Sequence, residues 1–299
     1  MRAPDLVTGA RIALDPVPYV LVAPAAVLLG VMILFPLLLV AGTSLTDWQI
    51  GAGWPNFVGL DTYKELLADP DFRQAAANTV QYGLMAVPTT TVLGLLAALL
   101  ISACGRGAAV YRLILFVPSV ATLAAMAVAW QLLFSPAVGG IPQLVRAFGY
   151  MPGNWLQDRT IALPILALIG VWSEAGFAML FFLAGLKSVP RELHEAMELD
   201  NGGIAGRVFH VILPHLAPIS VFVLAFTALR ALRVFDTVAI ITRGGPEKST
   251  LVILYYIYQQ GFQLFRTNLA AGASVLFIVV VILLSAVQLL LGRRTAGGK

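Results

Sequence analysis

The stretch IALPILALIGVWSEAGFAMLFFLAGL, residues 161–186, decides the fold class, because Glu174 is its one ionisable residue and the rest is almost entirely apolar. A run of about 20 or more apolar residues is long enough to cross the hydrocarbon core of a bilayer as a helix. No water is present there, so the backbone polar groups must be satisfied within the segment, as they are in an α-helix. Residues 161–186 therefore predict a transmembrane helix.

Other apolar runs share this character, and they lack the alternation of a membrane β-barrel strand. The predicted spans are residues 19–45, 75–104, 110–134, 161–186, 216–234 and 269–291. Of the 299 residues, 59% are hydrophobic and 11% are charged, which excludes an ordinary soluble globular domain. We therefore expect an all-α membrane protein with six transmembrane helices, in which residues 19–292 form one membrane domain between short tails at 1–18 and 293–299.

The distribution of Lys and Arg predicts the orientation in the membrane. When the N-terminus is placed in the cytoplasm, the cytoplasmic segments hold more of the 19 basic residues than the outer segments do, in agreement with the positive-inside rule. Both termini are then cytoplasmic. The formal net charge of +4 is spread along the chain without a basic run, so we expect no nucleic-acid partner.

Some strings resemble catalytic or metal-binding motifs but lack a required residue. His194-Glu195-Ala196-Met197-Glu198 begins like the zinc-protease motif HExxH, yet Glu198 occupies the position of the second metal ligand. Gly244-Gly245-Pro246-Glu247-Lys248-Ser249-Thr250 lacks the glycine that precedes the lysine of a P-loop. The single cysteine, Cys104, excludes an internal disulfide and a cysteine-based metal cluster. We therefore expect that this chain catalyses no reaction and binds no cofactor or metal.

A polar segment follows the fourth predicted span and reads Glu195-Ala196-Met197-Glu198-Leu199-Asp200-Asn201-Gly202-Gly203, with Val211-Ile212-Leu213-Pro214 after it. Pro190 suits the first turn of a helix, because its missing N–H needs no partner there. Asn201 and Gly202 favour a turn, since both residue types adopt left-handed geometry at low cost. The pattern predicts two short helices, the second over residues 204–213 and ending before Pro214, which together form a knob at the inner face of the membrane.

This segment resembles the EAA loop of the sugar-type permease subunits of binding-protein-dependent ABC importers, the maltose- and glycerol-phosphate-like group. The family motif reads E-A-A, then D-G, then I-x-L-P after a fixed gap, and Glu195-Ala196, Asp200 and Leu213-Pro214 match it here. The chain departs from the motif at Met197, where the family has alanine, and at Asn201, where the family has glycine. The resemblance continues over nearly the whole chain, for example in Phe57-Val58-Gly59-Leu60-Asp61-Thr62-Tyr63 and in Thr242-Arg243-Gly244-Gly245-Pro246.

The resemblance implies a transport subunit of the bacterial inner membrane, surrounded by lipid, that works with other chains. A second permease subunit would complete the pore as a heterodimer, and an extracytoplasmic solute-binding protein would deliver the solute. Two ATPase subunits would bind ATP and Mg²⁺, and the coupling segment 187–215 would dock on one of them. The coupling residues that the resemblance implies are Glu195, Ala196, Glu198, Asp200, Asn201, Gly202, Leu213 and Pro214.

Ionisable residues also occur at membrane depth. Glu174 lies near the middle of the fourth predicted span, and Arg230 and Arg233 lie three residues apart on the fifth. Charges in contact with lipid are costly, so these side chains should pair with each other or face a cavity. One interpretation is a structural ion pair between Glu174 and one arginine. The other, which the resemblance implies, is that all three line the translocation path together with Trp172.

If the arginines line the path, they favour an anionic solute such as a polyol phosphate or a phosphodiester, because guanidinium binds phosphate in a bidentate fork. Two other classes of function stay open. A polytopic membrane enzyme acting on lipid-linked substrates would need an acid pair or a metal constellation, and an ion-coupled secondary transporter commonly shows an inverted repeat. The hypothesis is therefore half of a translocation pore for a carbohydrate or polyol-phosphate solute, coupled to a separate ATPase.

Overall fold

A computed structural model describes residues 16–51, 53–189 and 206–296, and within these ranges the chain is helical with a single extended bridge between Thr46 and Phe57. The elements are α1 (Pro16–Leu29), η1 (Gly30–Leu34), α2 (Phe35–Thr43), α3 (Asp61–Ala68), α4 (Pro70–Ala103), α5 (Ala108–Val120), α6 (Leu123–Leu133), α7 (Gly140–Ala147), η2 (Trp155–Gln157), α8 (Ala162–Leu186), η3 (Arg207–Ile212), α11 (Leu213–Leu232), η4 (Val238–Thr242), α12 (Ile253–Tyr258), η5 (Gln259–Gln263) and α13 (Thr267–Ala296). The all-α membrane fold is thus confirmed.

Within the described ranges, 5 helical stretches are long and apolar enough to cross a membrane. They are Val20–Thr43, Pro70–Ala103, Ala162–Leu186, Val208–Leu232 and Thr267–Leu290. These correspond to the first, second, fourth, fifth and sixth predicted spans. The second begins earlier than expected because Pro70 occupies the first turn of α4, where its missing N–H is harmless, and the Asp69 side chain caps the helix by accepting from the Asp71 N–H at 2.9 Å.

The third predicted span is not one straight helix. It forms α5 and α6, which are bent by 99° where they meet. Ala121 and Thr122 adopt extended backbone angles between the two helices. Pro118 lies just before this break and cannot donate the N–H that the last turn of α5 would use. Counted as one bent span, α5 and α6 bring the described part of the chain to the six predicted spans, although residues 110–134 do not form one continuous helix.

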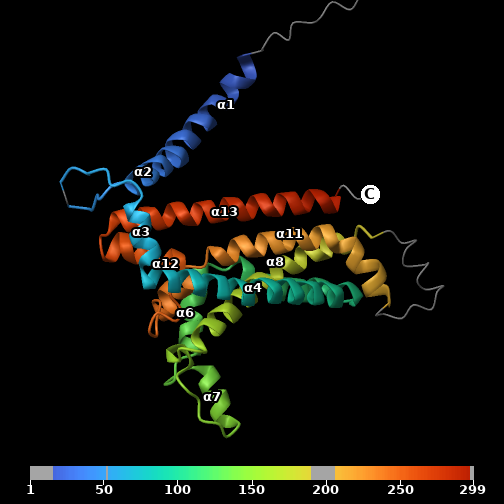
Figure 1. Cartoon of the computed structure of the whole chain (residues 1–299). Coiled ribbons are helices and arrows are strands. Elements are labelled where there is room, and N and C mark those ends of the chain that lie inside the picture. Colours follow the sequence, from blue (N-terminus) through green and yellow to red (C-terminus); the bar gives the residue numbers. More distant parts are fainter. Residues whose placement is uncertain (1–15, 52, 190–205, 297–299) are drawn as a thin grey trace, which may run out of the picture.

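The helices α4, α8 and α11 lie side by side and form the centre of the molecule (Figure 1). The contact between α4 and α8 is close because Gly94 meets Ala178 there, leaving no room for a further side chain. Buried side chains form one cluster around Tyr82 and Leu166 and a second around Phe182. The cavity described below lies at this centre, so its walls are set by tightly packed helices.

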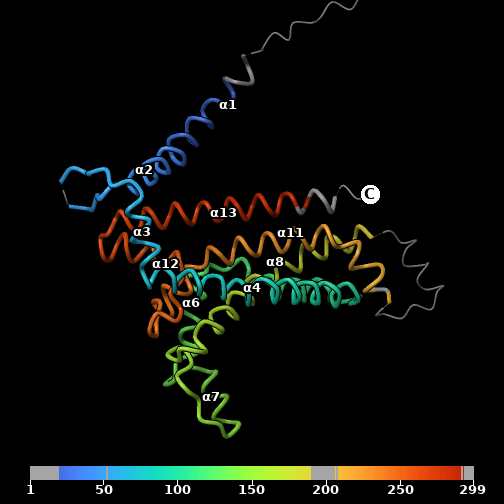
Figure 2. Tube along the Cα trace, in the orientation of Figure 1, coloured from blue at the N-terminus to red at the C-terminus, as the bar shows by residue number. Residues whose placement is uncertain are grey.

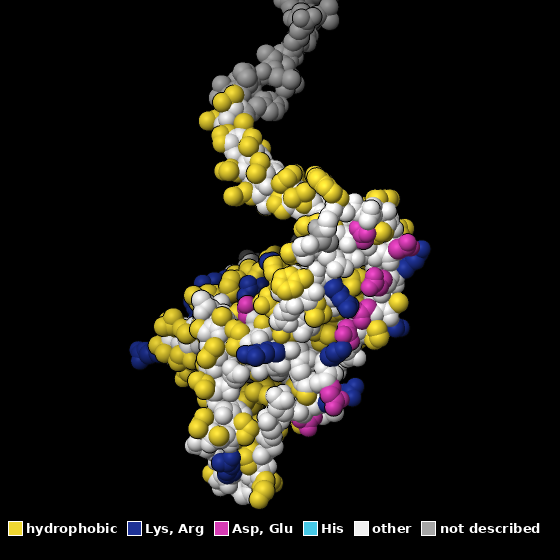
Figure 3. Space-filling model, turned by 90° about the vertical axis from the view of Figure 1, so that its left-hand side faces the viewer, with side chains coloured by type: hydrophobic (Ala, Val, Ile, Leu, Met, Phe, Trp, Pro, Cys, Tyr) yellow, Lys and Arg dark blue, Asp and Glu magenta, His cyan; other side chains and the backbone are white. Residues whose placement is uncertain are grey.

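The first span behaves differently, because the Val20–Thr43 stretch buries none of its residues. The tube in Figure 2 shows α1, η1 and α2 leaving the bundle at an angle, while α13 runs along it. In Figure 3 the side chains of the projecting helix are almost all hydrophobic, and charged side chains gather along one edge of the molecule. A helix of this kind can be stable only against lipid or another protein chain.

Candidate translocation site

An ion pair joins the two central helices α8 and α11. The Nε and Nη2 atoms of Arg230 both donate to Oε1 of Glu174, at 2.8 and 2.5 Å. The Glu174 side chain is only 14% exposed and the Arg230 side chain is 41% exposed. The Arg230 guanidinium also lies over the ring of Phe226, with Cζ 5.7 Å from the ring centroid, an arrangement that attracts a cation to the aromatic face. The structure therefore contains the predicted pair and identifies Arg230 as its cation.

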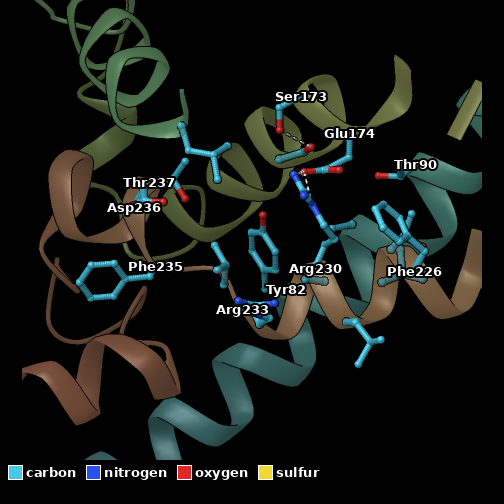
Figure 4. A pocket seen from close by; sticks show the side chains of 18 residues that line it. Tyr82, Thr90, Ser173, Glu174, Phe226, Arg230, Arg233, Phe235, Asp236 and Thr237 are labelled. Carbon is cyan, nitrogen blue, oxygen red and sulfur yellow. Dashed lines mark hydrogen bonds and ion pairs between the residues drawn. The ribbon is translucent and has the colours of Figure 1, made fainter. Parts of the chain in front are cut away.

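This pair also forms part of the wall of a cavity of about 480 Å³ between α4, α8 and α11. Figure 4 shows Glu174 and Arg230 meeting on one side of it, with Arg233 on the segment that follows α11. The Oε2 atom of Glu174 is buried and has no hydrogen-bond partner within the described residues. The two interpretations of these charges are therefore compatible, because the pair is structural and still borders an open polar space.

Arg233 does not continue the helical face of Arg230. The helix α11 ends at Leu232, and Arg233 occupies its C-terminal cap with φ of −92° and ψ of 16°. Its exposed side chain lines the same cavity and forms no ion pair with a carboxylate of the described residues. Their spacing of three residues would place Arg230 and Arg233 one turn apart on one face of a continuous helix. The helix stops between them, so this expectation does not hold.

Sequence reasoning missed other polar residues of the cavity. The side chains of Tyr82, Thr90, Ser173, Asp236 and Thr237 also line it. Asp236 and Thr237 belong to the short segment between α11 and η4, beyond the fifth predicted span, so a search for charges inside apolar runs does not reach them. The sequence signal that could have found them is a pair of opposite charges, Arg233 and Asp236, on either side of a single turn. Such a pair at the end of an apolar run indicates that the membrane helix breaks there.

Trp172 was expected in the same path, but the structure places it elsewhere. It is 44% exposed and lines a smaller hollow of about 240 Å³ with Trp130 and Met126. Its ring meets Trp130 edge-on, at a centroid distance of 5.3 Å. Residues two apart on a helix point to different sides, so Trp172 and Glu174 cannot face one cavity from a regular α8.

The predicted coupling residues lie mostly outside the described part of the chain. These are Glu195, Ala196, Glu198, Asp200, Asn201 and Gly202. Leu213 and Pro214 are described, and they form the first turn of α11 directly after the π-helix η3. The expectation that a short helix ends before Pro214 is therefore wrong, because proline is tolerated in a first turn and the preceding turn widens to a π-helix, in which the Leu213 N–H donates to the Val208 carbonyl.

The end of α8 packs against the first turns of α11. Gly185 near the end of α8 packs against Leu216 and Ile219 of α11, and a Cβ at residue 185 would clash with both. Ser188 Oγ lies 3.5 Å from His215 Nε2. Residues 185–188 and 215–219 therefore form one packed junction between α8 and α11.

On the predicted outer side, the loop 243–252 is fastened to α4. The buried Asn78 amide donates to the carbonyl oxygens of Lys248 and Leu251, at 2.9 and 2.8 Å. The Tyr256 hydroxyl donates to Asp69 at 2.6 Å, and burial together with this bond raises the pKa of Tyr256 above its ordinary value. These bonds hold the outer end of the cavity wall in place.

The described residues contain no group of three or more His, Cys, Asp or Glu that could hold a metal ion. Helices of membrane-spanning length around a cavity with charged walls are the features of a membrane transport subunit. Residues 90–297 match the family described as binding-protein-dependent transport system inner membrane component, and the chain belongs to this family. It is therefore a multi-pass inner-membrane permease subunit of a binding-protein-dependent ABC importer.

Relatives of similar length support this assignment. The chain is 31% identical over 274 residues to the sn-glycerol-3-phosphate transport system permease protein UgpA of Pectobacterium atrosepticum, covering 91% of this chain and 92% of that protein. It is 32% identical over 274 residues to the Escherichia coli protein of the same name, with the same coverage of 91% and 92%. The fold matches a chain of a bacterial alginate ABC transporter, crystallised with an alginate pentasaccharide-bound periplasmic protein, with a TM-score of 0.83, 20% identity and coverage of 94% and 95%.

Proposed function

We propose that this subunit forms half of the translocation pore for a phosphate-bearing polyol, such as sn-glycerol 3-phosphate or one of its phosphodiesters. The observation that carries the proposal is the cavity, where Arg230 and Arg233 stand at the wall between otherwise apolar helices. Arginine at membrane depth costs several kcal/mol, so its presence points to a function there. Guanidinium groups bind phosphate oxygens in pairs.

The acidic residues of the cavity suit the other part of such a solute. Glu174 and Asp236 also line the wall, and ionised carboxylates only accept hydrogen bonds, so they pair with donors such as polyol hydroxyl groups. A neutral carbohydrate would use the carboxylates but not the arginines. The names of the UgpA relatives refer to sn-glycerol-3-phosphate transport, which agrees with a cavity wall that carries both arginines and carboxylates.

The proposal extends to coupling with a separate ATPase. Segment 187–215, with Glu195 and Gly202 at its centre, acts as the cytoplasmic docking knob, and two ATPase subunits bind the ATP and Mg²⁺. The proposed coupling is supported by the packing of Gly185, on α8, against Leu216 and Ile219, on α11. A knob attached to two packed helices moves them together. Displacement of the knob then reaches Glu174 on α8 and Arg230 on α11.

The proposed assembly has a second permease subunit and an extracytoplasmic solute-binding protein, with both termini of this chain, 1–18 and 293–299, in the cytoplasm. The first span supports a partner in the membrane, because α2 packs mainly against α13, along part of its length, and no residue of Val20–Thr43 is buried within this subunit. The structural relative that was crystallised with a periplasmic protein supports the delivery partner.

The experiment is uptake by proteoliposomes that contain the complex purified with its own partner chains, the solute-binding protein added outside and ATP enclosed. We expect labelled sn-glycerol 3-phosphate to accumulate, excess unlabelled solute to compete, and maltose not to compete. Ionophores that collapse ion gradients should leave uptake unchanged, which separates the importer from an ion-coupled transporter. Accumulation of maltose without accumulation of glycerol 3-phosphate would refute the solute class. Conversion of the solute into a lipid-linked product would favour the enzyme alternative.

A further inference from the structure

The two arginines of the cavity have different surroundings. Arg230 is already engaged, because two of its nitrogens donate to Glu174 and its face lies over Phe226. The Nε–Nη2 fork is the edge that would hold an anion in two bonds, and a solute could take that edge only by displacing a carboxylate that is 14% exposed. Removing one partner of such a pair leaves an uncompensated charge, which is strongly unfavourable. Arg230 thus serves as a structural link between α8 and α11.

Arg233 stands in the opposite situation, together with two neighbours on the same short segment. The side chains of Arg233 and Asp236 form no hydrogen bond and no ion pair with any described residue, although they lie only three positions apart in the sequence. Thr237 is 6% exposed, and its hydroxyl is buried without a hydrogen-bond partner among the described residues. All three line the cavity, and Figure 4 shows Asp236 and Thr237 together on one side of it.

A buried hydroxyl without a partner is costly and rare in native proteins. The cost is offset when a ligand supplies the missing bond. The three groups offer a guanidinium fork and a hydroxyl donor, which suit an anionic oxygen, and a carboxylate, which suits a hydroxyl on the same molecule. The helix is interrupted at residues 233–235, between the end of α11 and the helical turn that Asp236 and Thr237 begin, so Arg233 and the other two side chains belong to different helical stretches that meet at the cavity.

We propose that Arg233, Asp236 and Thr237 form the solute-recognition subsite of the cavity, taking a phosphate oxygen beside a hydroxyl, whereas Arg230 is a positioning residue that ties α8 to α11. The inference rests on the proposed function, since it requires a phosphate-bearing solute. It goes further by assigning recognition and support to different arginines.

The test compares two properties of the detergent-purified complex with its partner chains. One is the Tm without solute, and the other is the rise in Tm when sn-glycerol 3-phosphate is titrated, which reports affinity. Arg233→Gln should keep the solute-free Tm and weaken apparent affinity about tenfold or more, the loss expected for a charged hydrogen bond. Arg233→Lys should recover part of it. Arg230→Gln should lower the solute-free Tm but change affinity less than about threefold.

Two further variants separate recognition from structure. Thr237→Val should raise the solute-free Tm or leave it unchanged, because it removes an unpartnered buried hydroxyl, and it should weaken affinity about threefold to tenfold. Glu174→Gln combined with Arg230→Gln should restore part of the Tm lost in the single Arg230 variant, because no charge is then left alone. Arg159→Gln is the matched control, since Arg159 pairs with the exposed Glu247 away from the cavity.

The outcomes are distinct. If the wild-type complex imports no phosphate-bearing solute, the proposed function fails and the subsite with it. If import is normal but Arg233→Gln and wild type show equal Tm shifts with solute, the subsite alone is refuted. Equal loss of affinity in the Arg230 and Arg233 variants would also refute the division between them.

Discussion

The close contact of Gly94, on α4, with the helix α8 allows a quantitative prediction for the variant Gly94→Ala. A Cβ at residue 94 would lie 2.5 Å from the Ala178 Cβ and 3.0 Å from the Met179 backbone nitrogen. Ordinary carbon contacts are about 3.5–4.0 Å, so the helices would have to separate by about 1 Å. Overpacking of this kind costs about 1–3 kcal/mol, and the better helix propensity of alanine returns about 0.5–1 kcal/mol.

The net loss of up to about 2.5 kcal/mol corresponds to a Tm lower by up to about 10 °C in a protein of this size. Gly83→Ala is the control on the same helix, because a Cβ at residue 83 meets nothing within 4 Å, and its Tm should rise by about 1–4 °C. The double variant Gly94→Ala/Ala178→Gly moves the methyl group to the other helix and should recover most of the loss. The assay is thermal unfolding of the purified complex followed by tryptophan fluorescence. A Gly94→Ala variant as stable as the Gly83→Ala control would refute the close packing of α4 and α8.

Further changes test the site and its supports. Asn78→Ala should lower stability by about 1–3 kcal/mol, measured as a Tm shift, because two backbone carbonyls lose their donor; an unchanged Tm would contradict this. Tyr256→Phe should cost about 1–2 kcal/mol by deleting the bond to Asp69, visible as a lower Tm at neutral pH. Trp172→Ala should leave solute affinity within about twofold of wild type, since its ring lies outside the cavity, and a tenfold loss would place it in the path. Glu195→Lys should abolish solute-stimulated ATP hydrolysis while the complex still assembles, and unchanged hydrolysis and uptake would remove it from coupling.

Much of the fold could be predicted because membrane helices are selected by a simple physical requirement. The run around Glu174 is apolar and long, so both its helical state and its position follow from the bilayer. The charged residue within it could likewise be matched with an arginine on another span, because an unpaired charge at that depth is too costly. Both predictions rest on the cost of placing a backbone group or a charge in the bilayer, and this cost can be judged from each segment alone.

The remaining features depend on contacts between segments or on local breaks. The bend after Val120 and the end of α11 before Arg233 are set by a few backbone angles, which apolar content does not encode. For the same reason, Trp172 was grouped with Glu174 although α8 points them in different directions. Asp236 and Thr237 were not predicted because they lie beyond the apolar run. They line the cavity only because α11 ends before them.

The bent span between α5 and α6 has a consequence for the permeability of the membrane. With 13 and 11 residues, the two helices reach only about 20 and 16 Å at 1.5 Å per residue, so neither alone crosses a hydrocarbon core of about 30 Å. The first turn of α6 has no side-chain cap, and its Leu123 borders the cavity. Its free N–H groups need water at that depth. The cavity is where such water could lie, so the seal against leaking ions would depend on the side chains packed on either side of it.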